Sequence, residues 1–571
     1  MEVIKTFGPQ LPLRARINLS PVRKHTPFLL TSKSLKLPKK VLLKATATSA
    51  FDGRESNRTF KKLPPSEWTS HFLSVSVDNS EMDVLRREIE ALKPKVRGML
   101  LSSQGREAKK KRILLIYQLV SLGLAWHFED EIKESLEESF KSIADMMVGE
   151  YDLYNVSIIF WVFRTYGHNM SSDVFKRFQG DDGKFKEHLI EDIKGILALY
   201  EAANMGTKTD YVMDEAISFA TTHLESFSIG KMCSSHFKTR IQNALGISQY
   251  HNMEIIVAKE YIPFYEHEDD HDITLLKLSK LKFNLLQLHY TQELKIVTEY
   301  VISSVIILFN FYVHYTCLNN HTKNDDHDDD KIDRCLCSWS PDDVNAIYNL
   351  PSYLKVVCKI IYDAFEEFEK EMVREGRLYC LKETIEEFKR LVKSNHDLAK
   401  WALESHIPSF DEYMEVGEVE ITVYAVLTMA FMCMGDVVEE EAYQWLKSRP
   451  KLIESSCSKA RLLNDIAGFE DDMSRGYVTN GIKCYMKQYG VTEEEAIREL
   501  RKIISDMDKT MKEEFLNTKN VKPFRVLKSV IDCARMSNVT YNVAVGEGLT
   551  HPEGKISSYY MPSLFLNRFS L

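Results

Sequence analysis

The sequence contains little that breaks helices or builds strands. Its 571 residues include only 23 glycines and 16 prolines, and runs that alternate apolar with polar residues are hard to find. Half-buried strands depend on that alternation, and the turns between them depend on Gly and Pro. These shortages disfavour a fold built on sheets.

Paired cysteines of the Cys-x-x-Cys kind are also missing among the ten cysteines. Cys335 and Cys337 are one residue apart and follow His321 and His327, but this spacing fits no common zinc site. We therefore expect free, buried thiols and a reducing compartment.

Acidic residues are scarce at the N-terminus, where Glu2 is the only one before Asp52. Ser and Thr recur there, and no long apolar run of the secretory kind is present. The same segment holds ten basic residues: Lys5, Arg14, Arg16, Arg23, Lys24, Lys33, Lys36, Lys39, Lys40 and Lys44. This composition predicts an organelle transit peptide over residues 1–50, and a disordered basic tail is the alternative.

The remainder of the chain is acidic, because removing residues 1–50 leaves 64 Lys and Arg against 82 Asp and Glu. Its net charge is therefore about −18. Nucleic acid is not an expected partner for such a surface. The overall composition, 44% hydrophobic and 27% charged, is that of a globular protein rather than a disordered one.

Apolar residues recur at steps of three and four, which predicts amphipathic helices and an all-α fold. The pattern predicts a helix pair over residues 112–147. Further helical segments are expected over residues 210–227, 366–394 and 491–516.

The length favours two domains, and the polar stretch after Ile262 indicates a boundary near residue 265. We predict an N-terminal helical domain over residues 51–264 and a C-terminal one over 265–571. The segment 300–318 has nineteen uncharged residues, but its polar members and the absence of a close basic flank favour a buried helix over a membrane span.

Several blocks occur in the order found in plant terpene synthases, and the chain resembles that family over most of its length. The blocks are "RTFKKLPPSEWTSHF" (58–72), "LGLAWHFEDEI" (122–132), "HNMSSDVFKRF" (168–178), "LALYEAA" (197–203), "THLESF" (222–227), "FDEYMEVGEVEITVYA" (410–425), "RLLNDIAGFEDDMSRG" (461–476) and "GEGLTHPEGK" (546–555). Thr59 stands where many members carry a second Arg.

The resemblance implies two helical-barrel domains, of which the C-terminal one ionises a prenyl diphosphate as a carbon–oxygen lyase. From the transit peptide predicted over residues 1–50, we expect a plastid location for the mature protein. Loss of diphosphate from an allylic carbon requires that several negative charges be neutralised. Hard divalent cations held by carboxylate oxygens do this, so Mg²⁺ or Mn²⁺ is the expected cofactor. We also expect a monomer with no stable membrane insertion.

The second metal-binding motif of the family is matched by Asn464, Gly468 and Asp472, at positions i, i+4 and i+8 of one helix face. Members usually have Ser or Thr at the place of Gly468, so this ligand would be a water, and Asp472 is shorter than the usual Glu. Arg461 resembles the diphosphate-binding arginine of the family and suits phosphate geometry.

The first metal-binding motif is where the chain departs from the family. Members carry Asp-Asp-x-x-Asp at the end of an apolar helix, and the matching helix here reads Phe-Asn-Phe-Tyr-Val over 309–313. The family's Arg-x-Arg pair is also missing, since no arginine occurs between Arg240 and Arg334. The loss of this clamp and of part of the cavity wall indicates impaired closure over a diphosphate.

An acidic run follows that helix, with five aspartates between residues 325 and 330. Asp325, Asp326 and Asp329 satisfy Asp-Asp-x-x-Asp literally, but so dense a run matches almost any acidic pattern. Its polar neighbours favour a solvated loop over a metal site. A second acidic stretch, 266–272, is expected to be a solvated linker.

The C-terminal loop departs as well, with Glu547 and Leu549 where members commonly have an Asp and an aromatic residue. Tyr541 remains as a catalytic-pocket residue, or equally as a partly buried core tyrosine. We interpret the chain as a terpene synthase relative descended from an enzyme for a C20-type or longer substrate, with little or no activity. The alternatives are an active enzyme that uses the 325–330 run, and a non-catalytic protein that binds prenyl diphosphate or pairs with an active synthase.

Overall fold

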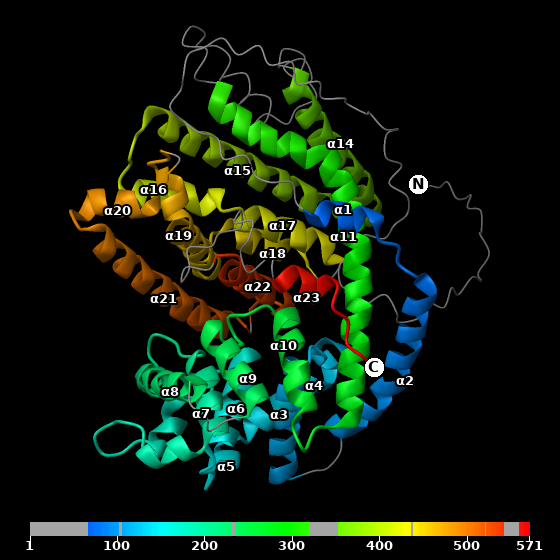
Figure 1. Cartoon of the computed structure of the whole chain (residues 1–571), viewed down its shortest axis with the longest axis vertical. Helices are drawn as coiled ribbons and strands as arrows, with labels where there is room; N and C mark the ends of the chain where they lie inside the picture. Colours follow the sequence, from blue (N-terminus) through cyan, green and yellow to red (C-terminus); the bar gives the residue numbers. More distant parts are fainter. Residues whose placement is uncertain are drawn as a thin grey trace, which may run out of the picture. The chain divides into compact units, whose positions relative to one another are not determined.

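The computed structural model describes eight stretches of the chain: residues 67–101, 105–229, 234–318, 352–435, 438–474, 476–519, 521–541 and 559–571. Within them, the side chains of 67–70, 296–318, 352–360 and 403 are not described. Helices joined by turns and loops make up these stretches, and an isolated bridge between Gln179 and Phe185 is the only strand-like pairing in them (Figure 1). The all-α prediction is confirmed.

The helices up to residue 266 are short to medium in length. They are α1 (Glu67–Ser74), α2 (Asn79–Leu101), α3 (Arg106–Ser121), η2 (Ala125–Phe128), α4 (Glu129–Lys141), α5 (Ile143–Met147), α6 (Leu153–Thr165), η3 (Ser172–Phe178), η4 (Glu187–Glu191), α7 (Ile193–Ala203), α8 (Tyr211–Ile229), α9 (Ser235–Gly246) and α10 (Glu254–Glu266).

The second group starts with α11 and ends near the C-terminus. It consists of α11 (Ile273–Leu318), α14 (Ser352–Glu375), α15 (Leu378–Glu404), α16 (Phe410–Glu420), α17 (Val423–Cys433), α18 (Glu440–Lys447), α19 (Lys451–Ser474), α20 (Gly481–Tyr489), α21 (Glu493–Thr518), α22 (Phe524–Thr540) and α23 (Met561–Phe565).

Helix α11 connects the two groups. It runs for 46 residues without interruption, and it contacts α1, α2 and α10 as well as α14 and α23 (Figure 1). The residues from Glu55 to Leu571 form one compact unit. The proposed boundary near 265 falls at the end of α10 and stays a prediction.

The acidic stretch 266–272 links α10 to α11, and its side chains are exposed or half-buried. Asp272 Oδ1 accepts hydrogen bonds from the backbone nitrogens of Thr274 (2.7 Å) and Leu275 (3.0 Å). This residue therefore satisfies backbone donors in the first turn of α11.

Side-chain caps explain where the helices around the later site begin. Ser409 starts α16 and Thr492 starts α21, each with a capping box in which a glutamate three residues on returns the hydrogen bond. Asn480 Oδ1 accepts from the backbone nitrogen of Ile482 at 2.9 Å and starts α20.

The helical segments expected from the sequence are found, with one difference. Residues 210–227 and 491–516 lie in α8 and α21, and 366–394 lies in α14 and α15. The helix pair predicted over 112–147 is wrong in detail, because this segment divides into α3, η2, α4 and α5. Gly123, with φ +70°, lies at the first break, where an added Cβ would be 3.0 Å from Ala258 Cβ.

The apolar core includes side chains from both groups of helices. One continuous cluster extends from Met82 in α2 to Ala534 in α22, and a smaller one lies between α15, α16, α19, α20 and α21. Five of the ten cysteines are described, all as free thiols and all but Cys433 buried; the others are Cys380, Cys457, Cys484 and Cys533.

The described residues include one stretch, Phe410–Cys433, that is long and apolar enough to cross a membrane, with a mean hydropathy of 1.5. It comprises α16 and α17 and is interrupted at Thr422. A buried core helix passes the same test, so this stretch is weak evidence for a span. The side chains of 300–318 lie outside the described residues.

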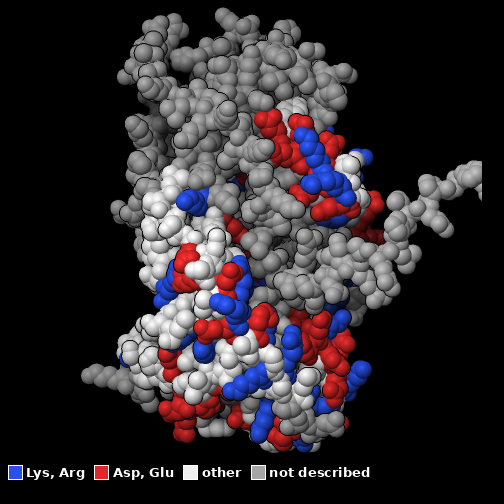
Figure 2. Space-filling view, turned by 90° about the vertical axis from the view of Figure 1, so that its right-hand side faces the viewer, with Lys and Arg blue, Asp and Glu red and all other residues white. Residues whose placement is uncertain are grey.

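Basic and acidic side chains lie interspersed over the described surface that faces the viewer in Figure 2. Ion pairs also join distant segments of the chain. Lys277 of α11 pairs with Glu88 of α2 at 3.0 Å, and Arg568 near the C-terminus pairs with Glu81 of α2 at 2.5 Å.

Candidate functional site

Helix α19 carries four of the residues predicted for the site: Arg461, Asn464, Gly468 and Asp472. Arg461 is buried, and the other three are half-buried. The structure brings Arg461 and Asn464 together, because Asn464 Oδ1 accepts a hydrogen bond from Arg461 Nη2.

Asp472 belongs to a different contact. Its Oδ2 accepts a hydrogen bond from Asn480 Nδ2 at 3.1 Å, and the same Nδ2 lies 3.2 Å from the carbonyl oxygen of Asp465. Asn480 therefore fixes the start of α20 against α19. Asn464 and Asp472 are separated by two turns, about 12 Å along the helix axis.

Arg461 is the centre of a buried ionic group. Its Nη1 donates to Glu420 Oε2 at 2.6 Å, and its Nη2 donates to Asp465 Oδ1 at 2.8 Å. Tyr413 OH donates to the same Asp465 oxygen at 2.8 Å. We call Arg461, Asn464, Asp465, Glu420 and Tyr413 the Arg461 cluster.

The cluster has one more potential negative charge than positive. Burial raises the pKa of both Glu420 and Asp465, and the guanidinium of Arg461 opposes the rise at each. Burial lowers the pKa of Arg461, but Asp465, Tyr413 and Glu420 together hold it well above its usual value. The arginine is therefore a fixed cation that already faces two carboxyl groups.

Two glycines make room for this packing. A Cβ at Gly417 in α16 would lie 2.7 Å from Arg461 Cδ and 3.1 Å from its Cγ. A Cβ at Gly481 in α20 would lie 2.4 Å from Asp465 Oδ2 and 3.2 Å from Tyr413 Cε1. The close packing of α16 and α20 against α19 therefore depends on these two residues being glycine.

Tyr541 lies at the C-terminal end of α22 and is half-buried. Burial raises the pKa of its hydroxyl, and this rise is opposed by Arg461 and by a hydrogen bond with Asn464. The structure therefore places Tyr541 beside the Arg461 cluster. Its role as a catalytic-pocket residue stays a prediction.

The residues of α19 fit a divalent cation that keeps most of its water. Asn464 and Asp472 offer one amide oxygen and one carboxylate, and Mg²⁺ binds well to such sparse oxygen sets because it retains several waters. Among the described residues, a Cβ at Gly468 would have only Asp472 Oδ2 within 4 Å, at 3.8 Å, so these residues leave room for a water above this glycine. In the described stretches, no group of three or more His, Cys, Asp or Glu residues is placed to hold a metal.

Three predicted ligands, Asp325, Asp326 and Asp329, lie outside the described residues. The backbone of 309–313 lies in α11, but its side chains are outside the described set. The structure therefore tests neither the acidic run nor the contacts of the Phe-Asn-Phe-Tyr-Val segment.

Sequence reasoning missed Glu420, Asp465, Tyr413 and Asn480. The four residues come from α16, α19 and the start of α20, and they meet only because these helices pack together. The sequence could have indicated Asp465, since this residue directly follows Asn464 inside the second metal-binding motif. Gly417 could have indicated the contact between α16 and α19, because a glycine inside a helical pattern suggests close packing.

The helical fold, with Arg461 buried and Asn464 and Asp472 on the same helix, agrees with the class of helical terpenoid synthases. Solved structures support this fold at low identity. Limonene synthase with 2-fluorolinalyl diphosphate matches with a TM-score of 0.77 and 22% identity, over 89% of this chain and 99% of that one. Isoprene synthase from grey poplar (Populus x canescens), in complex with three Mg²⁺ ions and dimethylallyl-S-thiolodiphosphate, matches with a TM-score of 0.68 and 23% identity, over 81% and 94%.

The chain belongs to the terpene synthase family. Residues 67–245 match the family model described as the terpene synthase N-terminal domain, and residues 329–510 match that of the terpene synthase family metal-binding domain. Terpenoid synthase 9 of Arabidopsis thaliana is 49% identical over 607 aligned positions, covering 99% of each chain. Since this chain has 571 residues, at least 36 of those 607 positions have no counterpart in it.

Proposed function

We propose that this chain is a plastid-targeted terpene synthase relative whose ability to ionise and cyclise a prenyl diphosphate is impaired or lost. The ancestral substrate we favour is of the C20 type. The observation that carries the proposal is the sequence of α11 over 309–313, which reads Phe-Asn-Phe-Tyr-Val and holds no carboxylate where the family resemblance places an aspartate motif. A deletion near this segment would account for aligned positions of Terpenoid synthase 9 that have no counterpart in this chain.

The proposal follows from the charge of the leaving group. A diphosphate departs when cations neutralise it on more than one side, and α19 supplies one such side with Arg461, Asn464 and Asp472. Removing a single preorganised charge-stabilising donor costs other enzymes about 3 kcal/mol or more of transition-state stabilisation. Loss of both the aspartate motif and the Arg-x-Arg pair is therefore expected to abolish turnover.

Mg²⁺, or Mn²⁺ in its place, is the cation we propose, and a prenyl diphosphate is the proposed ligand. When bound, the ion would neutralise charge on the diphosphate. Asn464 and Asp472 would hold it, with a water over Gly468, and Arg461 would hold the diphosphate. The isoprene synthase complex with three Mg²⁺ ions and a thiolodiphosphate supports this assignment.

The test is turnover of purified protein with Mg²⁺ or Mn²⁺ and each prenyl diphosphate from C10 to C25, with products extracted and identified by gas chromatography and mass spectrometry. We expect no hydrocarbon or alcohol above the level of a boiled control. Any terpene product would contradict the proposal.

A product would also decide between the alternatives. If the acidic run supplies the missing metal ligands, Asp325→Ala and Asp326→Ala eliminate the product, while replacement of Asp330 reduces it little. Binding of a prenyl diphosphate that requires Mg²⁺ and gives no product favours the non-catalytic alternative.

The plastid location rests on the basic, acid-poor segment 1–50, which lies outside the described residues. We expect residues 1–50 fused to a fluorescent protein to direct it into plastids, and the chain lacking these residues to stay in the cytosol. Cytosolic fluorescence of the fusion would contradict the location. A monomer is our expectation for the mature chain, and light scattering of the purified protein tests it.

A further inference from the structure

Glu420 is the less firmly held of the two carboxylates on Arg461. Asp465 has Tyr413 and Arg461 as hydrogen-bond donors, and its side chain is 1% exposed. Glu420 is 19% exposed, and among the described residues Arg461 is its only hydrogen-bond partner. One carboxylate is built into the packing, and the other is held by the guanidinium alone.

The position of Glu420 also lets it move. It is the last residue of α16, and the chain turns at Ile421 and Thr422 before α17 begins. A carboxylate at a helix end has fewer neighbours to displace than one in mid-helix. Asp465, in the interior of α19, has no such freedom.

Charge balance makes Glu420 the surplus anion. Arg461 and Asp465 neutralise each other through a 2.8 Å contact, and Asn464 and Tyr413 are neutral. Glu420 adds a second negative charge at 2.6 Å from Nη1, the side of the guanidinium that Asp465 does not use. An incoming phosphate oxygen needs a free guanidinium N–H of this kind.

We propose that Glu420 occupies the anion-binding side of Arg461 as an internal competitor, so that a diphosphate binds only after displacing this carboxylate. The inference rests on the proposed role of Arg461 as the diphosphate-binding residue. It makes Glu420 a positioning residue that lowers affinity for the diphosphate class of ligand.

Glu420→Gln is the variant that tests it, because glutamine keeps the shape and removes the charge. Glu418→Gln is the matched control. Glu418 lies on the same helix and is also half-buried, but its Oε1 accepts from Ser458 Oγ at 2.5 Å and not from an arginine. Both variants remove one negative charge from the same region.

The probe is inorganic pyrophosphate with MgCl₂, titrated calorimetrically into the full chain. We expect Glu420→Gln to bind pyrophosphate about tenfold more tightly than the unaltered chain, and Glu418→Gln to bind within about twofold of it. A damaged fold cannot raise affinity, so the gain is specific to a removed competitor. Glu420→Ala gives a second measurement, and it should show the same gain if Glu420→Gln does not fold.

Three results overturn the inference: unchanged or weaker binding by Glu420→Gln, an equal gain in Glu418→Gln, or no binding by any of the variants. Absence of binding in every variant contradicts the inference because removal of the Glu420 carboxylate should make Arg461 available to pyrophosphate. The proposed function fails separately, through terpene formation by the unaltered chain. Such turnover would leave the comparison of pyrophosphate affinities intact.

Discussion

At the scale of single residues, Gly417 decides whether Arg461 fits between α16 and α19. An alanine there would put a Cβ 2.7 Å from Arg461 Cδ, and the arginine cannot retreat because both Nη atoms are engaged. We expect Gly417→Ala to lower the free energy of unfolding by about 1–3 kcal/mol, since overpacking outweighs the better helix propensity of alanine. Urea denaturation followed by circular dichroism measures this.

Gly468→Ala is the matched control for that substitution. Of the atoms in the described part of the chain, its Cβ would meet only Asp472 Oδ2, at an ordinary contact distance of 3.8 Å. We expect this variant to gain about 0.5–1 kcal/mol from helix propensity. Equal effects of the two alanines would show that Gly417 is not a packing requirement.

Glu201, in α7, is a buried carboxyl whose charge is costly. Its Oε2 accepts from the backbone nitrogen of Gln249 at 2.8 Å, while Arg240 Nη2 stays 3.6 Å from Oε1. Burial raises the pKa of Glu201 from 4.5 to about 7, and Arg240 opposes the rise. Between pH 4.5 and about pH 7, Glu201 is therefore protonated in the folded chain and ionised in the unfolded chain.

This difference gives the pH dependence its sign. Between pH 4.5 and about pH 7 the native state binds more protons than the unfolded state, so stability falls as the pH rises, and the loss is complete above pH 7. The pKa change corresponds to about 3 kcal/mol. We expect the Glu201→Gln variant to lose less stability than the unaltered chain between pH 5 and pH 8, as measured by urea unfolding at each pH. Parallel pH profiles would contradict this.

At the scale of elements, the break between α16 and α17 depends on Thr422, which has φ +70°. A β-branched residue is strained in this left-handed region, whereas glycine adopts it without steric cost. We expect Thr422→Gly to raise the free energy of unfolding by about 0.5–1 kcal/mol, because relief of strain exceeds the added entropy of the unfolded chain. Differential scanning calorimetry would show a higher Tm.

Ser405 provides the comparison, since it has φ 53° at the end of α15 without a branched Cβ. Its replacement by glycine should change stability less than Thr422→Gly does. A loss of stability in Thr422→Gly would mean that contacts of the threonine side chain outweigh the backbone strain.

The elements also show how far the sequence predicts this molecule. Helix periodicity identified α8 and α21, and the motif in residues 461–476 identified the face of α19, because both signals are local. The contact between Arg461 and Glu420 was not predictable in this way, since it joins residues 41 positions apart and depends on the turn at Thr422. The helix pair expected over 112–147 left the position of its break unspecified, because apolar spacing continues across Gly123.

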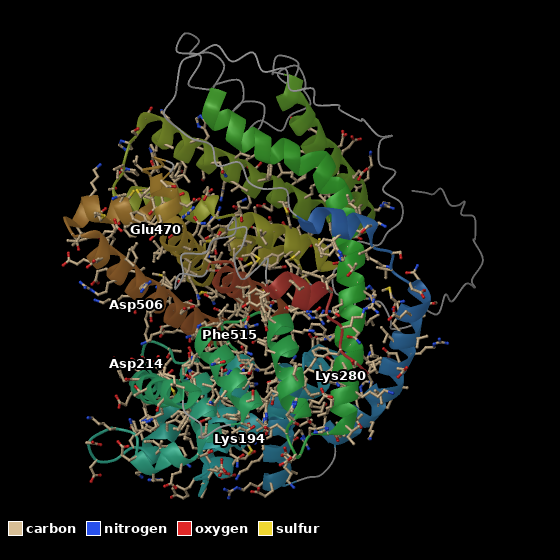
Figure 3. All side chains as sticks on the ribbon, in the orientation of Figure 1. Lys194, Asp214, Lys280, Glu470, Asp506 and Phe515 are labelled. Atoms are coloured by element: carbon tan, nitrogen blue, oxygen red, sulfur yellow. The ribbon has the colours of Figure 1, made fainter. Side chains whose placement is uncertain are left out.

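At the scale of the whole molecule, contacts between the early and late helices involve both exposed and buried ion pairs. Figure 3 labels Asp214 of α8 and Asp506 of α21, and one turn further along α21 Lys509 pairs with Asp214 at 2.6 Å. Asp214 is exposed, and Lys509 is half-buried with 26% of its side chain exposed. Exposed pairs of this kind contribute about 0–1 kcal/mol, so they do not by themselves hold the two groups of helices together.

Arg535 of α22 makes the buried connection. Its Nε donates to the carbonyl oxygen of Tyr250 at 2.8 Å, and its Nη1 donates to Asp532 at 3.0 Å and to Glu254 at 3.3 Å. The side chain is 8% exposed. We expect Arg535→Met to lower the free energy of unfolding by about 2 kcal/mol, because it leaves the carbonyl oxygen of buried Tyr250 without this donor. Asp532 and Glu254 are about half exposed and keep Lys528 as a partner, so they add little to the loss.

Arg525→Met is the control, because Arg525 lies on the same helix and also contacts an early helix. It pairs with Glu129 of α4 at 2.5 Å, but 37% of the Arg525 side chain and 40% of the Glu129 side chain are exposed. Its loss should cost less than about 1 kcal/mol. Because the residues from Glu55 onward form one compact unit, we expect a single unfolding transition in the unaltered chain. In calorimetry, Arg535→Met should lower the Tm or separate that transition into two. Equal effects of Arg535→Met and Arg525→Met would show that burial of Arg535 does not hold the early and late helices together.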